Sequence, residues 1–223
     1  MKFRICAAML ALCMALAVLA ACGGGETPGP GDMPTWPPEL TSDPAAAPPR
    51  NNPIITITLE GGGVIRAELF PESAPNTVNN FLYLAERGFY DGLTFHRASP
   101  GAIIQGGCPN GDGTGGAGHR IAGEFRNNGF EGNNIAHVRG VLSMARLYDD
   151  FDSASSNFFI MHGERDELDG YYAAFGMVTS GMDVVNHIAT APREHEMLVT
   201  SVVIESITAD TRGVDYPVPE KIA

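Results

Sequence analysis

The chain has 223 residues, of which 44% are hydrophobic, and this is enough to fill the core of one domain of ordinary size. Its 26 acidic residues outnumber its 14 basic residues and give a formal net charge of -12. Lysine occurs only as Lys2 and Lys221, and the arginines are scattered singly. A nucleic-acid-binding surface is therefore excluded, because phosphates would be repelled and no basic patch can form.

The N-terminus predicts export. Lys2 and Arg4 precede an apolar run over residues 5–18, and small residues follow it, which is typical of a signal peptide over residues 1–21. The letters "LAAC" resemble the lipobox of bacterial lipoproteins, so we expect Cys22 to carry lipid and to hold the protein on the extracytoplasmic face of the cell membrane. An uncleaved anchor and an ordinary secreted protein remain the alternatives.

Residues 22–53 predict a disordered linker that follows the lipidated cysteine. From residue 23 onward they contain five glycines and nine prolines with few apolar side chains, so they cannot form a core. We expect Trp36 to be exposed. Cys6 and Cys13 leave with the signal peptide, so Cys108 has no partner for a disulfide. An inert buried thiol is favoured there over an oxidation-sensitive one.

The folded body begins with a hairpin and a helix. Residues 54–70 alternate between apolar and polar around a glycine triplet, which predicts two antiparallel strands. Residues 73–88 change to helical spacing, with Ser73 as the N-cap, Pro75 in the first turn and Gly88 as the stop. The apolar face of this helix consists of Val78, Phe81, Leu82 and Ala85.

Short apolar runs separated by glycine-rich turns follow, and each predicts a strand. They cover residues 93–98, 102–107, 140–145, 157–162 and 173–178. A second helix fits 181–189, and 198–207 reads as the last strand. About eight strands with two helices predict a mainly β protein, a closed eight-stranded antiparallel barrel capped by the helices. The domain spans 54–208, and the tail over 209–223 either packs on the barrel or hangs free.

Several chemistries can be set aside. The letters "GTGGAG" (113–118) match a dinucleotide fingerprint, but no strand precedes them and no amphipathic helix follows, so we interpret them as a loop with close backbone contacts. The histidines show no metal-ligand spacing, and "DDFD" (149–152) is interpreted as a solvated acidic turn. No nucleophile elbow exists, and Cys108 has no cationic neighbour in sequence. We expect neither a metal nor a cofactor.

Six stretches in chain order resemble the cyclophilin family of peptidyl-prolyl isomerases: "FHRASPGAIIQGG", "GTGG", "GVLSMAR", "SSNFFI", "LDGYYAAFG" and "GMDVV". The likeness covers residues 54 to about 207. It implies a barrel with a helix over each end, an active groove on the outer face, a monomer, and proline-containing polypeptides as substrates.

The chemistry of X-Pro rotation fits these residues. The barrier is about 18–20 kcal/mol, yet no bond breaks, so no nucleophile or cofactor is needed. A twisted X-Pro bond localises a lone pair on the proline nitrogen, which a fixed donor would stabilise, and Arg97 is the candidate. The resemblance implies that Gln105 supports Arg97, that Phe159 forms the floor, and that His96 is structural. It also implies substrate contacts from Phe95, Ala102, Ile103, Thr114, Ala145, Arg146, Asn157, Leu168 and Tyr172.

Four positions depart from the best-known members. Ala102 stands where a phenylalanine helps to hold the proline ring, which predicts a shallower pocket, and Asn157 replaces a glutamine. Tyr172 occupies a common histidine position. Glu167 replaces the tryptophan of members that bind cyclosporin tightly, so we expect weak binding of that drug. These changes leave a non-catalytic proline-binding or chaperone module as the alternative to an enzyme, whereas a purely structural envelope protein would have a degraded pocket.

Overall fold

The computed structural model describes residues 51–222. The predicted signal peptide (1–21), the predicted lipid site Cys22 and Trp36 lie outside the described residues. Within residues 51–222, neither helix is both long enough and apolar enough to cross a membrane.

The described residues form nine strands and two helices. The strands are β1 (Ile54–Leu59), β2 (Val64–Leu69), β3 (Thr94–Ser99), β4 (Ile103–Cys108), β5 (Val141–Met144), β6 (Phe158–Met161), β7 (Ala174–Ser180), β8 (Arg193–Glu194) and β9 (Met197–Asp210). The helices are α1 (Pro75–Ala85) and α2 (Met182–Thr190), and short 3-10 helices span Arg126–Asn128 and Asp166–Leu168.

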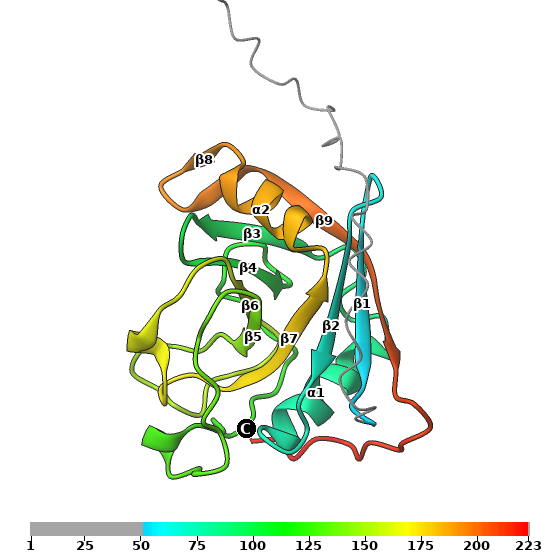
Figure 1. Cartoon of the computed structure of the whole chain (residues 1–223), viewed down its shortest axis with the longest axis vertical. Helices are drawn as coiled ribbons and strands as arrows, with labels where there is room; N and C mark the ends of the chain where they lie inside the picture. The colour runs from blue at the N-terminus through cyan, green and yellow to red at the C-terminus, as the bar shows by residue number, and fades with distance from the viewer. Residues whose placement is uncertain (1–50, 223) are drawn as a thin grey trace, which may run out of the picture. The chain divides into compact units, whose positions relative to one another are not determined.

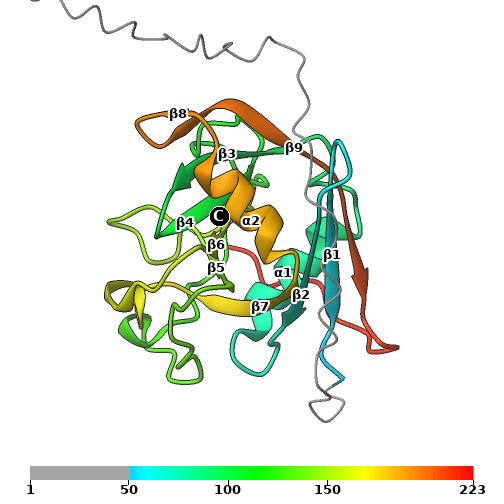
Figure 2. The ribbon, with the colours of Figure 1, turned by 45° about the horizontal axis from the view of Figure 1, so that its top comes forward.

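The strands close into a barrel. Neighbours follow the order β1-β2-β7-β5-β6-β4-β3-β9, and β1 pairs again with β9 to complete the circle. Every pairing is antiparallel. Strand β8 pairs only with β9 and adds a short outer hairpin. Helices α1 and α2 lie at opposite ends of the barrel (Figures 1 and 2). The predicted eight-stranded antiparallel barrel with two helices is confirmed.

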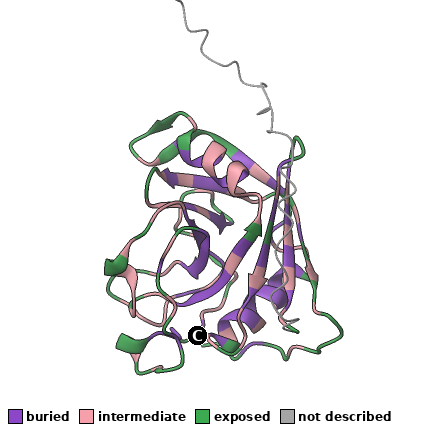
Figure 3. Ribbon diagram, in the orientation of Figure 1, coloured by how far each residue is buried: buried purple, intermediate pink, exposed green. Residues whose placement is uncertain are grey.

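The barrel interior is a continuous apolar core. Along β1, the side chains of Ile55, Ile57 and Leu59 are fully buried while the residues between them are partly exposed, as the two-residue period of a strand requires. Helix α1 contributes Phe81, whose ring centroid lies 5.0 Å from that of Tyr90. Buried residues are concentrated in the strands and in α1, and exposed residues in the connecting loops (Figure 3). The predicted apolar face of α1 is buried at all four positions, Val78, Phe81, Leu82 and Ala85.

The start of α1 differs from the prediction. Ala74, not Ser73, is the N-cap residue, and no side chain next to it in sequence caps the helix. The carboxylate of Glu124 instead accepts hydrogen bonds from the backbone N–H groups of Asn76 at 2.9 Å and Thr77 at 2.7 Å. A helix leaves its first N–H groups without helical partners, and here an acid from a distant loop satisfies two of them.

The segment after β9 packs on the barrel, which answers the question that the sequence left open. The side-chain amide of Asn76 exchanges two hydrogen bonds with the backbone of Glu220, at 3.0 and 2.8 Å. The backbones of Arg120 and Ile222 also exchange two hydrogen bonds, at 3.1 and 2.8 Å. The C-terminal segment therefore joins the first turn of α1 to the loop that contains Arg120.

Candidate active site

The outer faces of β5, β6 and β7 carry a second apolar cluster, distinct from the barrel core. Its buried members are Val141, Phe159, Met161 and Ala174. Because successive strand residues point to opposite faces, Phe158 enters the barrel core whereas its neighbour Phe159 lies in the outer cluster. A cavity of about 430 Å³ lies over Phe159, with Arg97 and Gln105 in its wall. We call this cavity the main groove.

Three hydrogen bonds hold the guanidinium of Arg97 in the wall of the main groove. Its Nη1 donates to Gln105 Oε1 at 2.9 Å. Its Nε and Nη2 both donate to Glu196 Oε2, at 2.9 and 2.5 Å. Gln105 and Arg97 face each other directly, because they are register partners in the pairing of β3 with β4. A charged donor is thus fixed beside an apolar floor.

A polar chain of Asp169, buried His137 and buried Ser143 lies next to Phe159. The His137 ring is stacked on that of Phe159, with centroids 6.1 Å apart. His137 Nδ1 lies 2.9 Å from Asp169 Oδ1, and Nε2 lies 3.0 Å from Ser143 Oγ. Burial lowers the pKa of His137, so at neutral pH we assign a neutral ring that donates to Asp169 and accepts from Ser143. Ser143 is fully buried, so it cannot serve as a nucleophile for a substrate in the groove.

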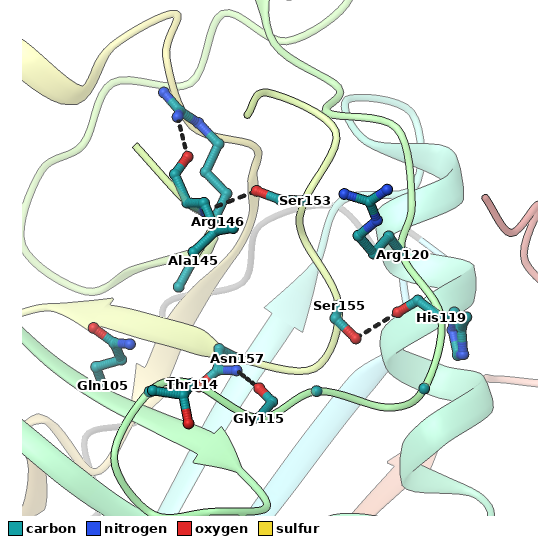
Figure 4. A pocket seen from close by; sticks show the side chains of 14 residues that line it. Gln105, Thr114, Gly115, His119, Arg120, Ala145, Arg146, Ser153, Ser155 and Asn157 are labelled. Atoms are coloured by element: carbon teal, nitrogen blue, oxygen red, sulfur yellow. Dashed lines mark hydrogen bonds between the residues drawn. The ribbon is translucent and has the colours of Figure 1, made fainter. Parts of the chain in front are cut away.

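A second cavity, of about 410 Å³, adjoins the main groove and shares Gln105 with it. We call it the side pocket (Figure 4). One wall is the predicted glycine loop, where the side-chain amide of Asn157 donates to the carbonyl of Gly115 at 2.7 Å. The buried Cys108 Sγ accepts from the N–H groups of Gly113 and Gly115, each at 3.2 Å. The loop is thus fastened from two sides, which supports its interpretation as a loop of close backbone contacts.

Arg146 separates the main groove from the side pocket and lines both. Its guanidinium carbon lies 4.5 Å from the centre of the Tyr172 ring, within the range of a cation–π interaction. Its Nε donates to the Tyr171 carbonyl at 2.9 Å, and its Nη1 donates to the Leu147 carbonyl at 2.7 Å. Arg146 therefore braces the partition between the two cavities.

The structure brings most of the predicted site residues together. The main groove is lined by Arg97, Ala102, Ile103, Gln105, Ala145, Arg146, Phe159, Leu168 and Tyr172. Thr114 and Asn157 line the side pocket. Glu167, at the tryptophan position, is exposed and also lines the main groove.

Phe95 was wrongly predicted to contact substrate. Its side chain is fully buried in the barrel core, with its ring centroid 5.7 Å from that of Phe158. Residues two apart in a regular strand share a face, so Phe95 and Arg97 should point the same way. The register of β3 shifts between them, and this irregularity turns Phe95 inward and Arg97 outward.

The acidic turn over residues 149–152 also differs from its prediction. Asp150 pairs with Arg120 at 2.8 Å. Asp152 Oδ1 accepts from the Gly123 N–H at 2.9 Å and from the Asn128 side chain at 2.7 Å. The turn is therefore a junction between loops rather than a solvated face. Among the described residues, no group of three or more His, Cys, Asp or Glu side chains is placed to hold a metal ion.

Sequence reasoning missed Glu196 and His137. Glu196 lies in no motif that points to a function, and its partner Arg97 lies 99 positions away. His137 is 1% exposed, and nothing local marks its contact with Ser143. The resemblance to a family was the one available signal, and none of the six stretches that carry it contains either residue.

A closed antiparallel barrel with an outer groove, an apolar floor and a fixed arginine is the arrangement that the resemblance to the cyclophilins implies. The family model described as "Cyclophilin type peptidyl-prolyl cis-trans isomerase/CLD" matches residues 54–209. The chain belongs to this family, and it is a peptidyl-prolyl cis-trans isomerase.

Curated relatives and solved structures agree. The chain is 47% identical over 141 residues to peptidyl-prolyl cis-trans isomerase B of Bacillus subtilis, an alignment that covers 63% of this chain and 94% of that protein. It is 44% identical over 128 residues to a peptidyl-prolyl cis-trans isomerase of Helicobacter pylori, covering 56% and 74% respectively. A cyclophilin-type isomerase of Cryptosporidium parvum, crystallised in the presence of the dipeptide Ala-Pro, matches with a TM-score of 0.62 and 30% identity over 69% of this chain and 96% of that chain.

Proposed function

We propose that Arg97 accelerates X-Pro rotation by donating to the proline nitrogen as the bond twists, with the proline ring on Phe159. The observation that carries this proposal is the fixed guanidinium beside an apolar floor in the main groove. Loss of amide resonance turns the proline nitrogen into an acceptor, so the donor binds the twisted state more tightly than either planar isomer.

The size of the effect is consistent with one donor. A thousandfold acceleration corresponds to about 4 kcal/mol, and a preorganised donor shielded from water supplies roughly 3–4 kcal/mol. Phe159 is 3% exposed, and a bound proline ring would cover the floor further. Gln105 fixes the guanidinium and lies at the junction of both cavities, where it can also contact the peptide backbone.

The test is the cis-to-trans relaxation of a proline tetrapeptide with the purified protein and with Arg97→Ala. We expect the variant to lose roughly a hundredfold to a thousandfold in kcat/KM at an unchanged unfolding midpoint. Arg66→Ala is the matched control, because Arg66 is also an arginine on a strand, is exposed, and does not line the groove. Full activity of Arg97→Ala would refute the role of Arg97.

We further propose that the isomerase acts on proline-containing polypeptides outside the cytoplasm, held at the membrane by lipid on Cys22. The support is in the sequence: Lys2 and Arg4, the apolar run, "LAAC", and the proline-rich stretch before the barrel. We expect broad specificity, because a groove that contacts mainly the substrate backbone and one proline ring makes few contacts with the substrate side chains on either side of that proline.

Cell fractionation and mass spectrometry test the anchor. In a bacterial host we expect the wild-type protein in the membrane fraction, with Cys22 as its acylated first residue. Cys22→Ser should appear in the soluble fraction or keep its signal peptide, and Cys108→Ser should behave as the wild type. An unmodified N-terminus in a soluble wild-type protein would refute the anchor.

A further inference from the structure

The β8–β9 hairpin brings a carboxylate to Arg97 that no sequence motif marks. Glu196 Oε2 accepts from both Nε and Nη2 along one edge of the guanidinium, while Gln105 accepts from Nη1. An arginine has five N–H groups in a rigid planar fork. These contacts use one N–H on each nitrogen, so one N–H on Nη1 and one on Nη2 are left for a substrate.

The backbone of the hairpin holds Glu196 next to Arg97. The Ala98 N–H donates to the Glu196 carbonyl at 2.8 Å, so the turn is fastened to the strand that carries Arg97. Arg97 is also the register partner of Met197 in the pairing of β3 with β9. His195 has a left-handed backbone (φ 58°), which is uncommon for a non-glycine residue and marks a tight turn held by its surroundings.

The ion pair does more for orientation than for stability. The side chains of Arg97 and Glu196 are 37% and 45% exposed, and exposed pairs contribute little to the free energy of unfolding. Without Glu196, however, the Arg97 guanidinium would keep only its contact with Gln105 and would sample more orientations, which would have to be frozen during catalysis. A two-point contact on the edge that faces away from Gln105 removes that freedom before substrate binds.

We infer that Glu196 is a positioning residue for prolyl isomerisation, which fixes the Arg97 guanidinium so that its remaining N–H groups point into the main groove. The inference rests on the role proposed above for Arg97. Glu196 also lines the main groove, but this role needs no contact between Glu196 and the substrate. Its loss should leave the apolar floor and ground-state binding in place, and should weaken the interaction that forms only as the X-Pro bond twists.

The experiment compares kcat and KM for Glu196→Ala and Glu196→Gln in the purified full chain. Glu196→Ala should lower kcat by roughly tenfold with little change in KM, as expected for an interaction made mainly in the transition state. Glu196→Gln keeps one acceptor oxygen and should recover part of the loss. Glu194→Ala, in the same hairpin but absent from the groove lining, is the control and should match the wild type.

Two further readouts separate a positioning role from hairpin stability. The Nε–H signal of Arg97 in NMR spectra should exchange slowly with solvent in the wild type and rapidly in Glu196→Ala. In the Arg97→Ala background, Glu196→Ala should have no further effect on kcat. The inference is overturned if Glu196→Ala leaves kcat unchanged while Arg97→Ala abolishes activity, or if both hairpin variants lose activity equally. Full activity of Arg97→Ala would instead refute the role proposed for Arg97, on which the role of Glu196 rests.

Discussion

Replacing Glu124 tests whether a distant acid caps helix α1. The side chain is 6% exposed and accepts two backbone N–H bonds, from Asn76 and Thr77, while no local side chain caps the helix. Hydrogen bonds to a charged group are worth about 1.5–3 kcal/mol, and loss of an N-cap typically costs about 1 kcal/mol. Because these contributions overlap, we expect Glu124→Ala to lower the free energy of unfolding by about 3 kcal/mol. Glu124→Gln should cost less, since its carbonyl still accepts one bond.

Urea unfolding followed by fluorescence or circular dichroism measures this difference through the midpoint at constant m-value. Glu131→Ala is the control, because Glu131 is an exposed acid on the neighbouring loop, and it should fall within about 0.5 kcal/mol of the wild type. A cost below about 0.5 kcal/mol for Glu124→Ala would show that water replaces the carboxylate without loss, and the capping argument would fail.

Two further predictions concern the groove. Exposed Glu167 at the tryptophan position should make cyclosporin binding weak, and a nanomolar dissociation constant by calorimetry would contradict this. The pKa of Glu196 is lowered, first by the hydrogen bond from Ser99 and then by Arg97, with Arg193 adding a weaker attraction. Since a depressed pKa keeps the carboxylate charged to lower pH than in an ordinary glutamate, the acidic decline in kcat should begin at a lower pH than an ordinary glutamate would give. Glu196→Gln should lack the decline, and an identical profile in both proteins would count against the ion pair.

The barrel could be predicted because its signals are local. The alternation over residues 54–70 and the helical stripe that contains Phe81 each depend on a few neighbouring residues, and both appear in the structure. The resemblance to a family placed Gln105 beside Arg97, and the structure has them together because they are register partners on adjacent strands of one hairpin. Period and turn chemistry are sufficient for the strands themselves.

The errors and omissions have a different physical origin. Phe95 was assigned to the site together with the motif that contains Arg97, but the irregularity in β3 turns the two side chains to opposite faces, and no letter in the sequence marks it. The partners of Glu124 and Glu196 depend on which loops the closed barrel brings together, across 47 and 99 positions. Such contacts follow from strand order and register, which a pattern in one short window does not contain.

The arrangement of the site suits a reaction that needs only a fixed donor. Phe158 and Phe159 are neighbours, but one fills the barrel core and the other forms the groove floor. The same hydrogen-bonded strands therefore carry the packing that stabilises the fold and the surface that meets the substrate. A closed barrel has no free edge along which these strands could shift, so the distance between Arg97 on β3 and Phe159 on β6 is set by the sheet itself. The position of the Arg97 guanidinium is set in the same way, because the hairpin that carries Glu196 is hydrogen-bonded to β3.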